Sequence, residues 1–124
     1  MAPRAAFSPD GKQFAVVGAT GWLAMWDAKE CTPLRLLAGH DAPVRGMTYS
    51  PDGRRLVTAD ATGFCKVWDA LTGEEILSFR AHDAAVNGVA FSPDGHRLYS
   101  AGSDRLLHLW DGTPREAAKT TTDR

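Results

Sequence analysis

The sequence is poor in cysteine. Its 124 residues include only Cys31 and Cys65, and the chain contains no Cys-x-x-Cys pair and no histidines paired at zinc-ligand spacing. A disulfide framework and a zinc site are therefore not expected. The plainer prediction is a reducing, cytoplasmic environment.

The sequence also lacks an excess of one charge and any long apolar run. Lysine and arginine number 14 against 15 aspartates and glutamates, and the basic residues are scattered. This composition indicates attraction neither to nucleic acid nor to a membrane surface. No 18 apolar residues follow one another and residues 1–7 hold no apolar run, so neither a membrane span nor a secretion signal is predicted.

Common catalytic motifs are missing as well. The chain has no Gly-x-Ser-x-Gly elbow and no phosphate-binding glycine loop. Serines and aspartates do recur, but in Ser-Pro-Asp-Gly segments that are typical of tight turns. We therefore predict no catalytic residue, no cofactor and no metal ligand, and a protein that is not an enzyme.

What the sequence does contain is a repeat of 42 residues. Three features recur in register: a Ser-Pro-Asp-Gly turn, a Trp-Asp pair and a histidine that precedes the turn. The turns begin at Ser8, Ser50 and Ser92, the pairs begin at Trp26, Trp68 and Trp110, and the histidines are His40 and His82. A fixed period of about 40 to 45 residues is typical of one small unit stacked several times.

Each repeat predicts short strands and no helix. Met47 and Tyr49 stand two residues apart before the turn, as in a half-buried strand. Second strands are expected at 13–17, 55–59 and 97–101, third strands end at the tryptophans, and fourth strands are expected at 34–37 and 76–79. Residues 117–121 are polar, so the fourth strand of the third repeat should be weak or absent. The prediction is eleven strands in an all-β fold.

The repeats are expected to divide the chain as follows. Repeat 1 covers residues 1–38 with a truncated first strand, repeat 2 covers 39–80, repeat 3 covers 81–112 with its last strand weak or missing, and 113–124 form a polar tail.

Together these motifs resemble the WD-repeat (beta-transducin-like) β-propeller family, over the chain as far as about Asp111. The resemblance implies antiparallel four-stranded blades. Three such blades form only an incomplete propeller, because closed propellers have about four to eight. Closure hides the sheet edges, so either the remaining propeller blades or another copy of the chain is an expected partner, for instance as six blades from two chains.

In that family a buried chain of side chains pins each blade, running from histidine to serine or threonine to tryptophan, with a turn aspartate on the histidine. Carried over, the third repeat has the complete set: His82, Ser100, Asp104 and Trp110. His40 and His82 are therefore interpreted as structural rather than catalytic or metal-binding. His96 is expected to be exposed and His108 to point outward, without a companion at ligand spacing.

The second repeat keeps His40, Thr58 and Trp68 but has Thr62 where the aspartate is expected. Asp60, two residues earlier, is the candidate substitute. The first repeat lacks the histidine and has neither the hydroxyl nor the aspartate, so order is expected to decline from the third repeat towards the N-terminus.

The resemblance also places partner contacts on one rim of the propeller, after each histidine and before each turn aspartate. The corresponding residues are Pro43, Arg45, Ala61, Ala85, Asn87 and Ser103. Arg45 and Asn87 are the preferred candidates, because their side chains donate several directed hydrogen bonds. Trp22 aligns with Phe64 and Leu106 and is therefore interpreted as a packing residue.

The leading functional hypothesis is a non-catalytic protein–protein interaction scaffold. One alternative is a regulatory propeller segment of a larger multidomain enzyme, such as a signalling kinase. The other is a self-assembling structural module. The partner protein and the number of blades in the full propeller stay open.

Overall fold

The computed structural model describes residues 4–111 and 122–123. These residues form twelve strands: β1 (Arg4–Phe7), β2 (Gln13–Val17), β3 (Leu23–Asp27), β4 (Thr32–Leu37), β5 (Val44–Tyr49), β6 (Arg55–Asp60), β7 (Phe64–Asp69), β8 (Glu75–Arg80), β9 (Val86–Phe91), β10 (Arg97–Gly102), β11 (Leu107–Asp111) and β12 (Thr122–Asp123). Across the described ranges no helix has the length and apolar character needed to cross a membrane.

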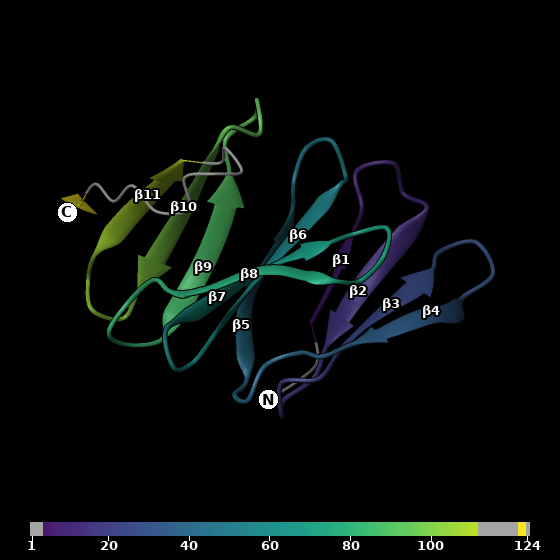
Figure 1. Cartoon of the computed structure of the whole chain (residues 1–124), viewed down its shortest axis with the longest axis horizontal. Coiled ribbons are helices and arrows are strands. Elements are labelled where there is room, and N and C mark those ends of the chain that lie inside the picture. Colours follow the sequence, from purple (N-terminus) through teal and green to yellow (C-terminus); the bar gives the residue numbers. More distant parts are fainter. Residues whose placement is uncertain (1–3, 112–121, 124) are drawn as a thin grey trace.

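The strands form three four-stranded antiparallel sheets that follow one another along the chain (Figure 1). Within each sheet every strand pairs with the next in sequence, from β1 to β4, from β5 to β8 and from β9 to β12. The register repeats as well, since Phe7, Tyr49 and Phe91 each lie opposite the first apolar residue of the following strand. We call the sheets blades 1, 2 and 3. The predicted all-β architecture of four-stranded antiparallel blades is confirmed.

A Ser-Pro-Asp-Gly turn joins the first two strands of each blade. In blade 2 the Ser50 hydroxyl donates to the Asp52 carboxylate at 2.6 Å, and the backbone N–H of Arg54 donates to it at 3.0 Å. These two hydrogen bonds lower the pKa of Asp52. Gly53 has a φ of 77°, in the left-handed region that glycine adopts without strain. The recurring serines and aspartates therefore build turns.

Two apolar cores lie between neighbouring blades. Alternate residues of a strand point to opposite faces, and the face that carries the tryptophan packs against the preceding blade. Trp68 of blade 2 shares one core with Leu23 and Met25 of blade 1. Trp110 of blade 3 shares the other with Cys65 of blade 2. Each blade is thus stabilised mainly by its neighbours.

The outer faces of the row have no neighbouring blade within the described residues. Phe7, Phe14 and Trp26 form the leading face of blade 1, with ring centroids 5.3 Å apart for Phe7 and Phe14 and 6.3 Å for Phe14 and Trp26. The aligned residues of blades 2 and 3 pack between blades, whereas Phe7 is 64% exposed. At the other end, blade 3 exposes Leu107 where blade 2 buries the aligned Cys65. We call that second surface the trailing face.

The described part of the fourth strand of blade 3 is short. Residues 117–121, where that strand was expected to be weak or absent, lie outside the described residues. The structure instead has the two-residue β12, which pairs with β11 through Leu107 opposite Asp123 and His108 opposite Thr122. The predicted count of eleven strands is therefore wrong by one.

Candidate functional site

Four side chains are joined by hydrogen bonds in blade 3. The Asp104 carboxylate lies 3.0 Å from Nδ1 of His82, and Nε2 of His82 lies 2.9 Å from the Ser100 hydroxyl. Nε1 of Trp110 donates to the same hydroxyl at 2.9 Å. Because a carboxylate only accepts, Nδ1 carries the imidazole proton and Nε2 accepts from Ser100. One serine thus links a buried imidazole to a buried indole.

Blade 2 builds the same chain with its aspartate in another place. Nδ1 of His40 lies 2.8 Å from Asp60 and Nε2 lies 2.6 Å from the Thr58 hydroxyl, to which Trp68 donates at 2.8 Å. Thr62 makes no hydrogen bond to the histidine in the described part of the chain. Its hydroxyl donates to the Asp60 carboxylate at 2.7 Å instead. The expected decline in order from the third repeat to the second is wrong, because Asp60 fills the role at the end of β6.

The electrostatics of this pair favour a fixed structure over proton transfer. Burial would raise the pKa of Asp60, but hydrogen bonds from Thr62 and His40 hold it below its usual value. Burial lowers the pKa of His40, although Asp60 opposes that shift. Near pH 7 the pair is therefore a carboxylate and a neutral imidazole.

In blade 1 a tryptophan occupies the corresponding place. A Cβ at Gly18, which aligns with Asp60, would collide with the indole of Trp22. Phe64, which aligns with Trp22, is covered by the Arg80 guanidinium 4.9 Å from its ring. Blade 1 has the short Ala38 in place of that arginine, and Trp22 is 44% exposed. Trp22 was expected only to pack. The missing arginine 16 residues later was the signal that it would be exposed.

The six predicted rim residues lie along one end of blades 2 and 3. Backbone hydrogen bonds join Ala61 to Pro43 and Ser103 to Ala85. Within blade 3, Asn87 donates to the Ser103 hydroxyl at 3.0 Å. Between blades 2 and 3, the Arg45 guanidinium makes a long 3.5 Å contact with the Asn87 side-chain oxygen.

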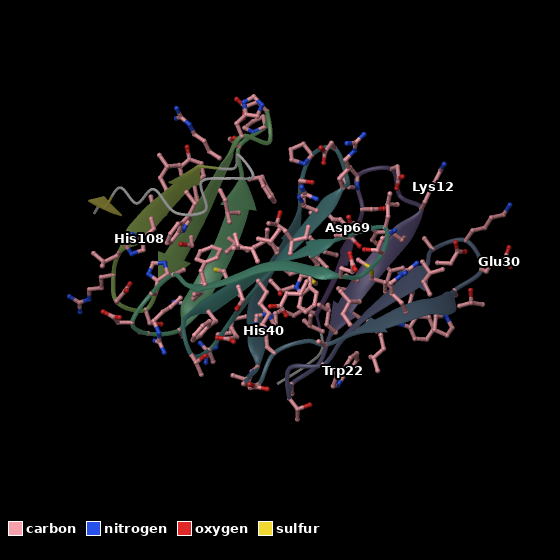
Figure 2. The ribbon with its side chains drawn as sticks, viewed as in Figure 1. Lys12, Trp22, Glu30, His40, Asp69 and His108 are labelled. Atoms are coloured by element: carbon pink, nitrogen blue, oxygen red, sulfur yellow. The ribbon has the colours of Figure 1, made fainter. Side chains whose placement is uncertain are left out.

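The rim extends towards blade 1. Arg4 donates a hydrogen bond to the Arg45 backbone carbonyl. In Figure 2, Trp22 and His40 lie towards the lower edge of the view, and Lys12 and Asp69 lie above them. The rim therefore combines an arginine, an amide and a half-exposed indole.

His108 departs from its sequence prediction. It was expected to point outward without a ligand companion, yet it is 9% exposed and its ring centroid lies 4.5 Å from that of His82. The reason is the period of two in β11. His108 shares a face with Trp110, and His82 covers that face. Burial and nearby His82 lower the pKa of His108. Ring nitrogens of both histidines and a carboxylate oxygen of Asp104 lie within 4.8 Å of one another.

Comparisons with known proteins agree with this geometry. The family model described as WD domain, G-beta repeat matches residues 31–69 and 73–111, ranges offset by the same 42 residues as the sequence repeat. No curated protein sequence matches the chain.

Solved structures share the fold at low sequence identity. The WD40 repeats of RRP9 match with a TM-score of 0.88 and 24% identity over 96% of this chain and 38% of that one. U3-55K matches with a TM-score of 0.88 and 24% identity over 97% and 38%. The β-propeller domain of Cps50 (Swd1) from Myceliophteria thermophila matches with a TM-score of 0.89 and 22% identity over 99% and 37%. The chain thus spans less than two fifths of each structure's length.

Proposed function

Because the chain belongs to the WD40 family of G-beta repeats, we propose that it is a non-catalytic protein–protein interaction scaffold that forms part of a larger propeller. Domains of this family are generally interaction scaffolds without catalysis of their own. The observation that supports this function most strongly is the rim, where Arg45, Asn87 and Ser103 are connected across two blades.

The chemistry of the rim suits a protein surface. Arginine and tryptophan are the residues that most often dominate binding energy at protein interfaces. Nε of Arg45 is buried without a hydrogen-bond partner among the described residues, so the guanidinium is only partly satisfied by its own chain. A carboxylate or backbone carbonyl on a partner would complete its hydrogen bonds.

The rim is tested by reversing one charge. Arg45→Glu should lower the recovery of proteins that co-purify with the chain from its native cells, while circular dichroism stays unchanged. Arg54→Glu is the matched control, because Arg54 is exposed in the turn at the opposite end of the same blade. Equal recovery of co-purifying proteins with both variants would contradict a role of the rim in binding.

We further propose that the leading and trailing faces bind blades of the same kind. Each internal contact already joins a leading face to a trailing face, through Trp68 in one case and Trp110 in the other. The free leading face carries the aligned aromatics Phe7, Phe14 and Trp26. This leading face can therefore pack against a trailing face like that of blade 3. The partner blade would come either from the rest of a longer polypeptide or from a second copy of the chain.

Phe7→Lys should weaken such an assembly, because it places a charge on the leading face without disturbing a buried core. Leu71→Lys is the matched control, since Leu71 is similarly exposed but lies in the β7–β8 turn. Light scattering coupled to size exclusion should show a smaller particle for the first variant only. Identical particles for both variants would contradict the proposed use of this face.

We also propose a reducing, cytoplasmic environment. Both cysteines are free, Cys31 exposed and Cys65 buried, and burial raises the pKa of Cys65 to about 12. Alkylation followed by mass spectrometry of the protein from native cells should find both thiols reduced. A disulfide at Cys31 would contradict this placement.

A further inference from the structure

Three side chains of types that commonly bind metals lie close together in blade 3. His82 precedes β9, Asp104 lies in the turn after β10, and His108 lies on β11. Their ligand atoms lie within 4.8 Å of one another. Zinc bonds of about 2.0–2.1 Å place tetrahedral ligand atoms about 3.3 Å apart, so small side-chain rotations would close the set around one ion.

His108 is the member of this group that the hydrogen-bond network leaves unused. Its Nδ1 is buried and has no hydrogen-bond partner in the part of the chain that the structure describes. A buried polar atom normally has a partner. The ring of His108 lies beside the His82 ring, with centroids 4.5 Å apart, and both nitrogens of His82 are hydrogen-bonded.

The group is reachable from solvent and carries negative charge. The His82 side chain is fully buried, but 17% of the Asp104 side chain is exposed. Asp104 supplies a carboxylate to the group. Asp83, exposed and adjacent to His82, adds a second carboxylate nearby.

We propose that His82, Asp104 and His108 bind a zinc ion. Two imidazoles and one carboxylate are ligands that zinc commonly takes, with water as the fourth. Nδ1 of His82 would bind the ion, and its proton would move to Nε2, from which it would donate to Ser100. The Ser100 hydroxyl would then accept from both His82 and Trp110. A ligand histidine usually donates its other ring N–H in this way.

Blade 2 supplies an internal contrast. It has the same His40–Asp60 pair, but Lys66 stands at the position of His108 and forms an ion pair with Glu75 at 3.1 Å. An ammonium group repels a cation at this place. The site is therefore expected in blade 3 and not in blade 2.

The proposal is tested by calorimetric titration of zinc chloride into the full chain, in the assembly in which it is purified. A Cys31→Ser background removes the exposed thiol, which binds zinc by itself. We expect one zinc per chain. His108→Ala and His108→Lys should weaken binding by more than about 100-fold, since outer-shell changes alone cost about 10–100-fold. His96→Ala is the matched control, because His96 is an exposed histidine outside the group.

Two further readouts keep the test decisive if a variant misfolds. Zinc should shift the NMR resonances of the His82 and His108 rings and leave those of His40 unchanged. Zinc should also raise the melting temperature of the unsubstituted chain. Absence of binding, unchanged binding in the His108 variants, an equal loss in His96→Ala, or zinc-induced shifts confined to other histidines would each overturn the proposal.

Discussion

Blades 2 and 3 each contain the same series of hydrogen bonds from aspartate to histidine to hydroxyl to tryptophan, although their sequences differ. In blade 2 the aspartate on the histidine is Asp60, the last residue of β6. In blade 3 it is Asp104, which stands in the turn after β10, and its side chain is the more exposed of the two. The position of the carboxylate therefore varies between blades, provided that it reaches Nδ1 of the histidine.

A single blade cannot hold both a turn aspartate and an aspartate at the end of its second strand. Blade 3 has Gly102 at the position of Asp60, and a Cβ there would lie 2.5 Å from Nδ1 of His82 and 2.7 Å from the Asp104 carboxylate. A turn aspartate therefore requires a glycine at the end of the second strand. An aspartate at the strand end leaves the turn free for Thr62.

The largest expected effect tests whether the two blades are equivalent. Trp68→Ala should lower the free energy of unfolding by about 3–5 kcal/mol, because it leaves a cavity in a core and removes the hydrogen bond that Trp68 donates to Thr58. Trp110→Ala should cost the same within about 1 kcal/mol. Urea unfolding measures both. A difference far outside that margin would break the comparison.

The aspartates should show the difference between the blades. Asp60→Ala leaves Nδ1 of the buried His40 without an acceptor and should cost about 3 kcal/mol. Asp104→Ala should cost about half of that, because water can replace a partly exposed carboxylate. The measurement is urea unfolding at pH 7 in the presence of a chelator. Asp52→Ala, which removes an exposed turn carboxylate, is the control. A larger loss at Asp104 than at Asp60 would reverse our assignment.

Gly102→Ala should cost about 2 kcal/mol, because its methyl group pushes His82 away from Asp104. Gly88→Ala in the same blade is the control, since a Cβ at Gly88 meets no atom within 4 Å. Thermal unfolding should separate the two variants. A neutral Gly102→Ala would show that the network tolerates a side chain there.

The smallest effect is a pH dependence. Burial keeps the pKa of His40 below its usual value of 6.5, so the unfolded chain binds the proton first as pH falls. Stability should therefore decrease as pH is lowered through about 6.5. The pKa of Asp60 is below its usual 3.8, so its contribution to the free energy of unfolding is present above pH 3.8 and is lost as pH falls further. Urea midpoints from pH 8 to 3 would test this, and a rise in stability between pH 7 and 5 would contradict it.

The sequence predicted the elements that depend on local chemistry and on the repeat. Ser-Pro-Asp-Gly turns determine their own hydrogen bonds, so strand boundaries near Ser50 followed directly. The third repeat's four residues came together because each stands at a fixed place in the 42-residue unit.

What could not be predicted depends on contacts between elements. Alignment by position offered Asp60 only as a substitute for the aspartate that is missing at Thr62, and the hydrogen bond between Asp60 and His40 confirms that candidate. His108 was assigned outward because its aligned neighbours are alanine and lysine, and only the path of His82 reveals its burial. The exposure of Trp22 likewise depends on a neighbour, because the short Ala38 does not cover the indole as Arg80 covers Phe64.

We propose that these blades form one section of a propeller and that their outer faces bind further blades. Native mass spectrometry of the unmodified chain tests this most directly. We predict a particle whose mass is a multiple of the 13.4 kDa chain, two copies being the simplest closed form. A stable, soluble, unassociated monomer would contradict the account.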